Sequence, residues 1–239
     1  MQKILCIGHS HMNAPRGVGS PANDVDFLSC TEELADGGAR DRHPGDFIAA
    51  DVDGDRYARI CLFVRASRHI VLGLVNHPDG CFDFYLPDQP QLPLIPLARL
   101  YPYGLMKAIL KRHMRQDFAD LTSLHTRFRR RPLYVIEPPA PSPREHVVRH
   151  PAGFAELIAR HGPSPDSLRY KFWRLHTQLL REFCGQTGMT LVPVPPQSVD
   201  EQGMLRAQYC RDDPSHGNLA YGALVIRQLR ALNEAVAGA

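Results

Sequence analysis

The chain has 239 residues, 44% of them hydrophobic, a composition that fits one globular domain and excludes a disordered chain. Its 28 basic and 25 acidic side chains leave a formal charge of +3, which is too small to indicate nucleic-acid binding. Its basic cluster, Arg127 with Arg129 to Arg131, precedes an apolar run. We interpret that cluster as a solvated helix end, with contact to an anionic substrate as the alternative.

The sequence shows neither a signal peptide nor a membrane span. The apolar run after Lys3 covers only residues 4–7, whereas a membrane helix needs about 20 apolar residues. The six cysteines show no paired spacing, and Cys6 and Cys61 lie in apolar runs typical of strands. We expect a reduced, cytoplasmic protein without disulfides, metal or other cofactor, and without a membrane or nucleic-acid partner.

Short apolar runs predict the strands of the first part of the chain. They lie at 2–7, 25–30, 58–64 and 70–75, and the last is equally compatible with a buried helix. Residues 31–56 are rich in Gly and Asp and predict an irregular insertion of loops with a small hairpin. The prolines within 86–102 alternate with apolar residues and predict an extended connection rather than a domain linker.

Helical periodicity dominates the rest of the chain. It predicts helices at 103–128, 166–186 and 217–236, with short strands at 133–136 and 190–194 that are each stopped by prolines. Strands alternating with helices indicate an α/β fold with a mainly parallel sheet. We therefore expect one domain over residues 1–239.

Ser10 directly follows the first predicted strand, in the sequence Gly8-His9-Ser10-His11. In an open α/β sheet, ligands bind beyond the carboxyl ends of the strands, and the helix that follows offers N–H groups to an anion. Ser10 is therefore a candidate nucleophile, although an ordinary N-cap serine gives the same pattern.

Asp213 and His216 lie three residues apart in a proline-containing turn before the last predicted helix. A serine hydroxyl needs an adjacent base, which a histidine supplies while a carboxylate orients its imidazole. Alone, this turn is equally typical of a helix start capped by Asp213 or Ser215. Together with Ser10, it predicts a Ser-His-Asp triad.

These two motifs together resemble the SGNH (GDSL-type) esterases and acyltransferases. Asn218 and Tyr221-Gly222 also match the last block of that superfamily, and the strand at 133–136 that runs into prolines resembles a family segment. His9 stands where the family usually has Asp, as in a divergent Gly-x-Ser-His branch. The resemblance implies a three-layer α/β fold with a mainly parallel, flavodoxin-like sheet, and ester chemistry on a small molecule or carbohydrate.

The resemblance also implies an oxyanion hole made by the serine N–H, a glycine N–H and an Asn side chain. Ser67 occupies the expected Asn position, and Gly38 and Gly45 are the candidates for the oxyanion glycine. Loss of one oxyanion donor costs about 2.7–4 kcal/mol of transition-state stabilisation, and a serine hydroxyl could retain part of it. The candidate oxyanion and substrate-binding residues are Gly8, His11, Ser67, His69 and Asn76, with a structural role as the alternative for His69.

The leading expectation is a serine esterase that forms an acyl-serine intermediate on a short acyl ester. An O-acyltransferase that moves the acyl group to or from a sugar or small metabolite is the alternative. The substituted Asn block also allows a non-catalytic protein of the same fold that binds a carbohydrate or a partner. A metal-dependent hydrolase using His9, His11 and Asp213 is weaker, because none of the twelve histidines shows the spacing of known zinc motifs.

Overall fold

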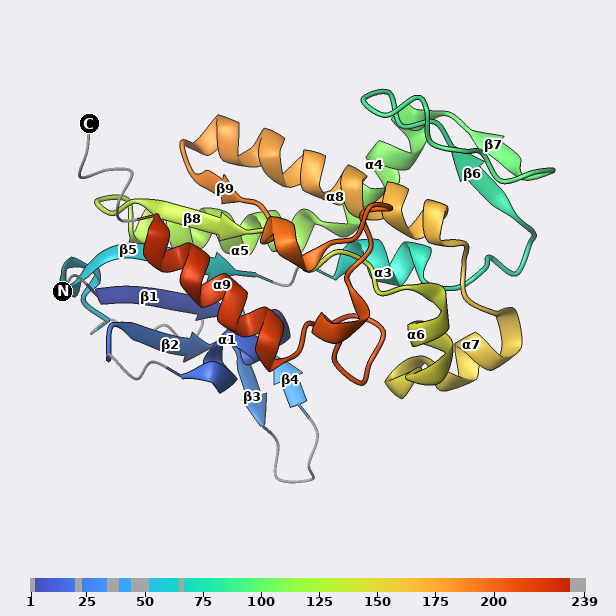
Figure 1. The fold of residues 1–239 in the computed structure, drawn as a ribbon. Helices are drawn as coiled ribbons and strands as arrows, with labels where there is room; N and C mark the ends of the chain where they lie inside the picture. Colours follow the sequence, from blue (N-terminus) through green and yellow to red (C-terminus); the bar gives the residue numbers. More distant parts are fainter. Residues whose placement is uncertain (1–2, 20–22, 34–38, 44–51, 65–66, 233–239) are drawn as a thin grey trace.

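The computed structural model describes residues 3–19, 23–33, 39–43, 52–64 and 67–232, and its centre is a five-stranded parallel sheet (Figure 1). The order in the sheet is β2-β1-β5-β8-β9. The strands are β1 (Lys3–Gly8), β2 (Val25–Ser29), β5 (Tyr57–Phe63), β8 (Leu133–Ile136) and β9 (Thr190–Val192). Counted along the chain, this is the 2-1-3-4-5 order of flavodoxin-like sheets, as predicted.

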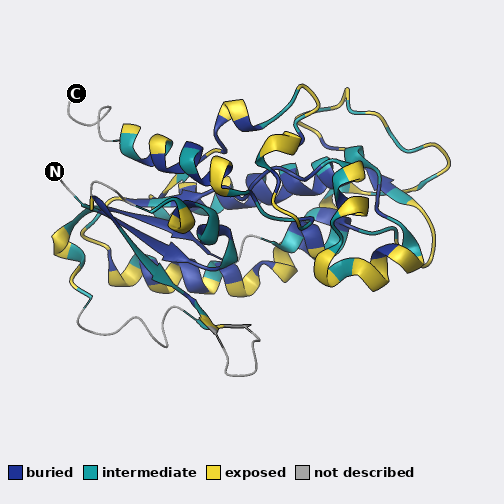
Figure 2. Ribbon diagram, turned by 60° about the horizontal axis from the view of Figure 1, so that its bottom comes forward, coloured by how far each residue is buried: buried dark blue, intermediate teal, exposed yellow. Residues whose placement is uncertain are grey.

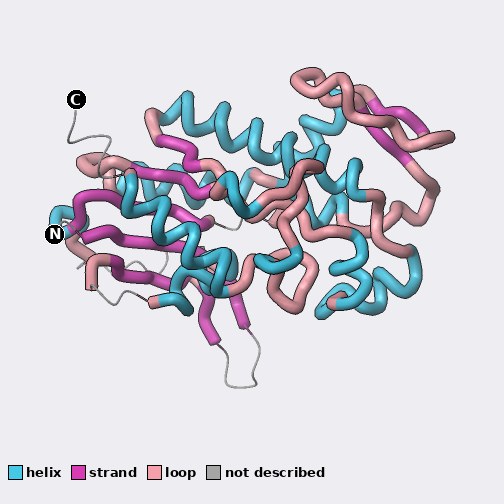
Figure 3. Tube along the Cα trace, viewed as in Figure 1, coloured by secondary structure: helices cyan, strands magenta, loops and turns pink. Residues whose placement is uncertain are grey.

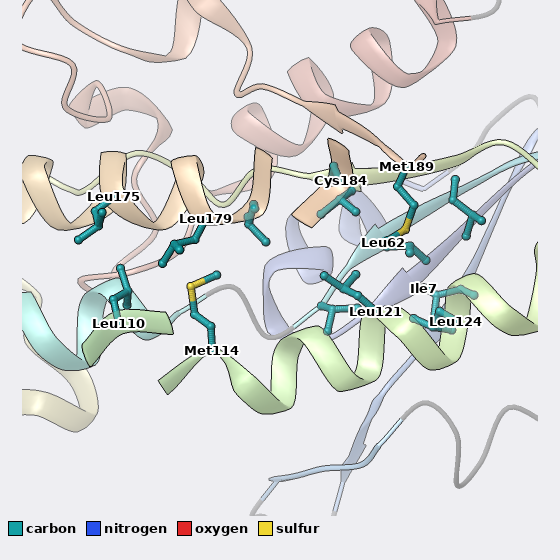
Figure 4. Packing of buried hydrophobic residues seen from close by; sticks show 14 of the residues in the cluster. Ile7, Leu62, Leu110, Met114, Leu121, Leu124, Leu175, Leu179, Cys184 and Met189 are labelled. Atoms are coloured by element: carbon teal, nitrogen blue, oxygen red, sulfur yellow. The ribbon is translucent and has the colours of Figure 1, made fainter. Parts of the chain in front are cut away.

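Alternate side chains of the sheet face two separate hydrophobic layers. In β1, Ile4 and Cys6 belong to one layer, whereas Leu5 and Ile7 belong to the other. The first layer is covered by α9 (Leu219–Ala231), against which α1 (Asn13–Val18) packs, and the second by α4 (Tyr103–His113), α5 (Arg115–Arg127) and α8 (Asp166–Thr187). Figure 2 shows the buried sheet between these helices, and Figure 4 shows the packing of the second layer. The predicted three-layer α/β fold is confirmed.

The structure divides one predicted helix in two and shows that one ambiguous run is helical. The run 103–128 is divided at Met114 into α4 and α5, because Met114 leaves the helical backbone angles (φ −83°, ψ 1°) while its side chain stays fully buried. The ambiguous run 70–75 forms α3 (Arg68–Gly73). Ile70, Gly73 and Leu74 are buried there while Val71 is exposed, which is the spacing of a one-sided helix rather than of a strand.

Two small sheets lie outside the central one, as Figure 3 shows. β3 (Thr31–Glu33) and β4 (Ala39–Asp41) form the predicted hairpin. β6 (Phe82–Phe84) and β7 (Arg99–Tyr101) form a parallel pair that the sequence analysis missed, and the Pro-rich segment is their crossover. Three-residue strands surrounded by prolines give too little periodicity to be recognised.

The remaining elements are short. They are α6 (Arg144–Arg149), α7 (Ala155–His161) and 3₁₀ turns at Ser10–Met12, Gly54–Arg56, Ala152–Phe154, Pro196–Ser198 and Ala207–Tyr209. Among the described helices, none combines the length and apolarity needed to cross a membrane.

Candidate active site

Ser10 is held by a turn that is fixed to the neighbouring strand. β1 ends at Gly8, where a Cβ atom would lie 2.4 Å from the Phe63 carbonyl oxygen on β5, so only glycine allows this approach. The next residue, His9, donates its N–H to the same oxygen at 3.0 Å, and its buried ring contacts the Arg42 carbonyl at 3.2 Å. Ser10 then begins the 3₁₀ turn that leads into α1.

The loop that carries Asp213 and His216 is closed by its own hydrogen bonds. The Arg211 N–H donates to the His216 carbonyl, and the Asp213 carboxylate accepts the N–H groups of Ser215 (2.8 Å) and His216 (2.9 Å). Asn218 caps α9 by accepting the Tyr221 N–H. The loop thus reaches α9 with the His216 ring in a defined position.

The structure brings the three predicted triad residues together. His216 Nε2 lies 2.8 Å from Ser10 Oγ, and His216 Nδ1 lies 3.0 Å from both carboxylate oxygens of Asp213. Ser215, considered only as a cap, also contacts Asp213 Oδ1 and His216 Nδ1 at 3.0 Å each. In the sequence, the signal for this contact with the triad is that Ser215 lies between Asp213 and His216.

Electrostatics keep Asp213 ionised. Burial alone would raise the pKa of this carboxyl. The hydrogen bond and charge of His216 and the N–H groups of Ser215 and His216 outweigh burial, so the pKa of Asp213 lies well below its usual value. A fixed carboxylate on Nδ1 holds the imidazole in the tautomer whose Nε2 can accept a proton from Ser10.

Two glycines let the helices that carry the triad pack closely. A Cβ at Gly222 of α9 would lie 2.4 Å from the Ala14 carbonyl group of α1, and a Cβ at Gly17 of α1 would lie 2.6 Å from the Leu219 side chain. Since α1 follows Ser10 and α9 follows His216, this packing sets the distance between the two side chains.

His11 and Ser67 lie beside the triad. His11 is buried, its ring centroid is 4.7 Å from that of His216, and its Nε2 lies 3.2 Å from Ser67 Oγ. Burial, reinforced by the His216 charge, lowers the pKa of His11 well below its usual value, so the ring is neutral. Ser10 and Ser67 follow β1 and β5, between which the strand order reverses, the usual position of ligand sites in such sheets.

Two further candidates, His69 and Asn76, have other hydrogen-bond partners or ring neighbours than the triad residues. His69 is buried 5.1 Å from His176, measured between ring centroids, and contributes with Pro214 to a cavity of about 10 Å³. The oxyanion role expected for Asn76 is wrong, because its side-chain amide donates to the His161 and Pro163 carbonyls. These bonds tie the segment after α3 to the end of α7 and the loop that follows it.

Gly8 is explained by packing, because it is buried inside the parallel ladder between β2 and β5. Gly38 and Gly45 lie outside the described residues. His176 was not predicted as a site residue, because in sequence it is one more inward-facing position of the helix at 166–187. No group of three or more His, Cys, Asp or Glu in the described part of the chain is arranged to hold a metal ion.

Several solved structures share this arrangement of strands and helices. A candidate platelet activating factor from Streptococcus pneumonia aligns with a TM-score of 0.56 at 12% identity, over 97% of this chain and 83% of its own. A candidate acylhydrolase from Bacteroides fragilis aligns with a TM-score of 0.51 at 8% identity, over 98% and 88%. No protein-family model and no curated protein matches the sequence. At such identities, the likeness is one of fold.

Proposed function

We propose that this chain, which has the fold of the SGNH hydrolases, is a serine esterase that cleaves a carboxylic ester through an acyl-serine intermediate. The observation that carries the proposal is the 2.8 Å contact between Ser10 Oγ and His216 Nε2, on an imidazole whose other nitrogen faces Asp213. A cap serine would not need a histidine from 206 residues further along the chain.

In the proposed first step, Ser10 Oγ attacks the ester carbonyl carbon while His216 Nε2 takes the hydroxyl proton. The carbonyl π bond breaks and its electrons form an oxyanion. The oxyanion electrons then re-form the carbonyl π bond while the bond to the leaving alcohol breaks, and the alcohol oxygen receives the proton from His216. Water attacks the acyl-serine in the same way, returns the proton to Ser10 and releases the acid.

The proposed oxyanion donors are the Ser10 N–H and the Ser67 hydroxyl. The Ser10 N–H opens the 3₁₀ turn, so the turn itself provides no acceptor for it. In this proposal, neutral His11 carries its proton on Nε2 and donates to Ser67 Oγ, so this contact uses the serine oxygen as acceptor and the hydroxyl donates to the oxyanion. The 3.2 Å contact is short enough for the hydrogen bond that this tautomer requires.

The deciding experiment uses a fluorophosphonate probe, which reacts with activated serines. We expect the purified chain to be labelled, Ser10→Ala to show no labelling, and Ser123→Ala, which alters an exposed serine of α5, to match the original chain. Equal labelling of Ser10→Ala would exclude the proposed nucleophile. A folded but unlabelled original chain would favour the non-catalytic binding protein.

The substrate class is tested with p-nitrophenyl esters of increasing acyl length, with and without sugar acceptors. We expect hydrolysis of the acetyl ester to be fastest, and chelators to leave its rate unchanged. Product formation that requires the sugar would replace the esterase proposal with acyl transfer.

A further inference from the structure

A second cavity lies apart from Ser10, Asp213 and His216. It has a volume of about 350 Å³ and is enclosed by β6, β7, α3, α4 and α8. None of the triad residues lines it. Its size falls within the range of small-molecule sites, and its floor is made by apolar side chains: Leu72, Met106, Ile109 and Phe172.

The two small strands β6 and β7 lie outside the central sheet (Figure 1). We call their residues 82–84 and 99–101 the roof, because Phe82, Arg99 and Tyr101 line the cavity. Side chains alternate along a strand, so Arg99 and Tyr101 both line the cavity while Leu100 between them is exposed. Phe82 lines the cavity from the other strand.

The roof is fixed by an ion pair in the protein interior. Lys171 of α8 and Asp83 of β6 are both fully buried, with Nζ at 2.9 and 2.8 Å from the two carboxylate oxygens. Lys171 also donates to the Pro93 carbonyl, and Asp83 accepts the Ile95 N–H, so the crossover is held at two further points. These contacts fix the crossover relative to α8.

The exposed residues that line the cavity, and so mark its mouth, include His77, Asp79 and Arg99. Among the described residues, no carboxylate pairs with the Arg99 guanidinium. His77 Nδ1 accepts the Asp79 N–H at 3.2 Å, so its proton sits on Nε2, which can donate. The Asp79 carboxylate is 87% exposed and therefore opposes an anion only weakly.

We propose that this cavity binds a small amphipathic carboxylate. The apolar chain or ring lies on the floor between α4 and α8, and the carboxylate meets Arg99, assisted by the His77 Nε2–H. An apolar floor favours the tail through burial, and a guanidinium offers two parallel donors that match a carboxylate. The proposal does not depend on the esterase activity of Ser10.

Cys81 provides a reporter, because it lines the mouth of the cavity and is exposed, whereas the other five cysteines are buried. The rate of Cys81 alkylation by a maleimide is measured with decanoate below its micelle concentration, with decanol, and with acetate. We expect decanoate to slow alkylation in a saturable way. Decanol should also slow it, with an apparent Kd about tenfold higher, and acetate should have no effect.

Two variants locate the site. Ile109→Trp should fill the floor and abolish protection, while Leu157→Trp, on the exposed face of α7, should keep it. Arg99→Gln should weaken decanoate about tenfold and leave decanol unchanged.

Three outcomes would overturn the proposal. They are no protection of the folded chain, equal affinity for decanoate and decanol, and protection that Ile109→Trp retains. Ser10→Ala is measured in parallel: it should bind decanoate normally even if it abolishes fluorophosphonate labelling, and loss of protection in that variant would instead assign the carboxylate to the triad. A failed esterase assay therefore leaves this result intact.

Discussion

At the scale of single residues, the candidate site contains side chains whose protonation depends on their surroundings. Asp213 is kept ionised by His216 and two backbone N–H groups, whereas His11, His69 and His176 are kept neutral by burial. A cluster of neutral imidazoles adjoins a triad in which His216 must gain a positive charge. Protonated neighbours would oppose that charge, so their burial supports the proposed chemistry.

Replacing Asp213 by Asn tests the orientation of the base. The variant can still accept the backbone N–H groups, but its amide favours the wrong imidazole tautomer. We expect kcat for the acetyl ester to fall by about 10⁴-fold. Ser215→Ala, which removes the hydroxyl contacts to Asp213 and His216, should cost about tenfold. Equal, small losses in both variants would show that Asp213 does not orient His216.

His176 predicts a pH dependence of stability. Burial, and secondarily the charge of Arg68, lowers the pKa of His176 to about 3, below its usual value of about 6.5. Between these values the unfolded chain binds one more proton than the folded chain. The free energy of unfolding therefore decreases as the pH is lowered through this window, by up to about 1.4 kcal/mol per pH unit from this residue.

The variant His176→Leu removes this proton uptake. Urea unfolding near pH 7 and near pH 5 should show a weaker loss of stability on acidification in the variant than in the original chain. His11 and His69, whose pKa values are also lowered, still make the stability of the variant depend on pH. An unchanged pH dependence would contradict a neutral, buried His176.

At the scale of elements, the distance between Ser10 and His216 depends on how closely α1 and α9 approach. The two side chains are 206 residues apart in sequence and each lies in a short loop before one of these helices. Gly222 removes the side chain that would separate the helices. The helix pair therefore has a direct role in assembling the triad.

Gly222→Ala should push α1 from α9, since the added Cβ meets backbone atoms that cannot rotate away. We expect a loss of about 1–3 kcal/mol in the free energy of unfolding and slower fluorophosphonate labelling of Ser10. Gly185→Ala, at an exposed position of α8 with nothing near its Cβ, is the control and should stabilise by about 0.5–1 kcal/mol. Similar behaviour of both variants would exclude the packing argument.

The roof over the second cavity depends on Asp83 and Lys171. Lys171→Met leaves a buried carboxylate without its counter-charge and should cost about 3–5 kcal/mol. Adding Asp83→Asn removes that charge, so the double variant should be more stable than Lys171→Met alone. Denaturant unfolding of both variants measures the difference, and a double variant less stable than Lys171→Met would contradict the interaction between the two charges.

At the scale of the whole molecule, the parallel sheet brings separate loops to one edge. β1 and β5 are neighbours at the point where the strand order reverses, so the segments that carry Ser10 and Ser67 both leave the sheet at this edge, where His11 contacts Ser67. The same topology carries the loop before α9 to this edge. The organisation of residues 1–239 as one domain stays a prediction.

The sequence by itself determined the central strands, the main helices and the triad candidates. Apolar periodicity and proline stops are local signals, and Ser10, Asp213 and His216 stand in short motifs. The break at Met114, the β6–β7 pair, the burial of His176 and the hydrogen bond from Asn76 to the end of α7 follow only from the three-dimensional packing. These features depend on which distant segments meet, and burial and hydrogen-bond partners arise from that meeting rather than from neighbouring residues in the chain.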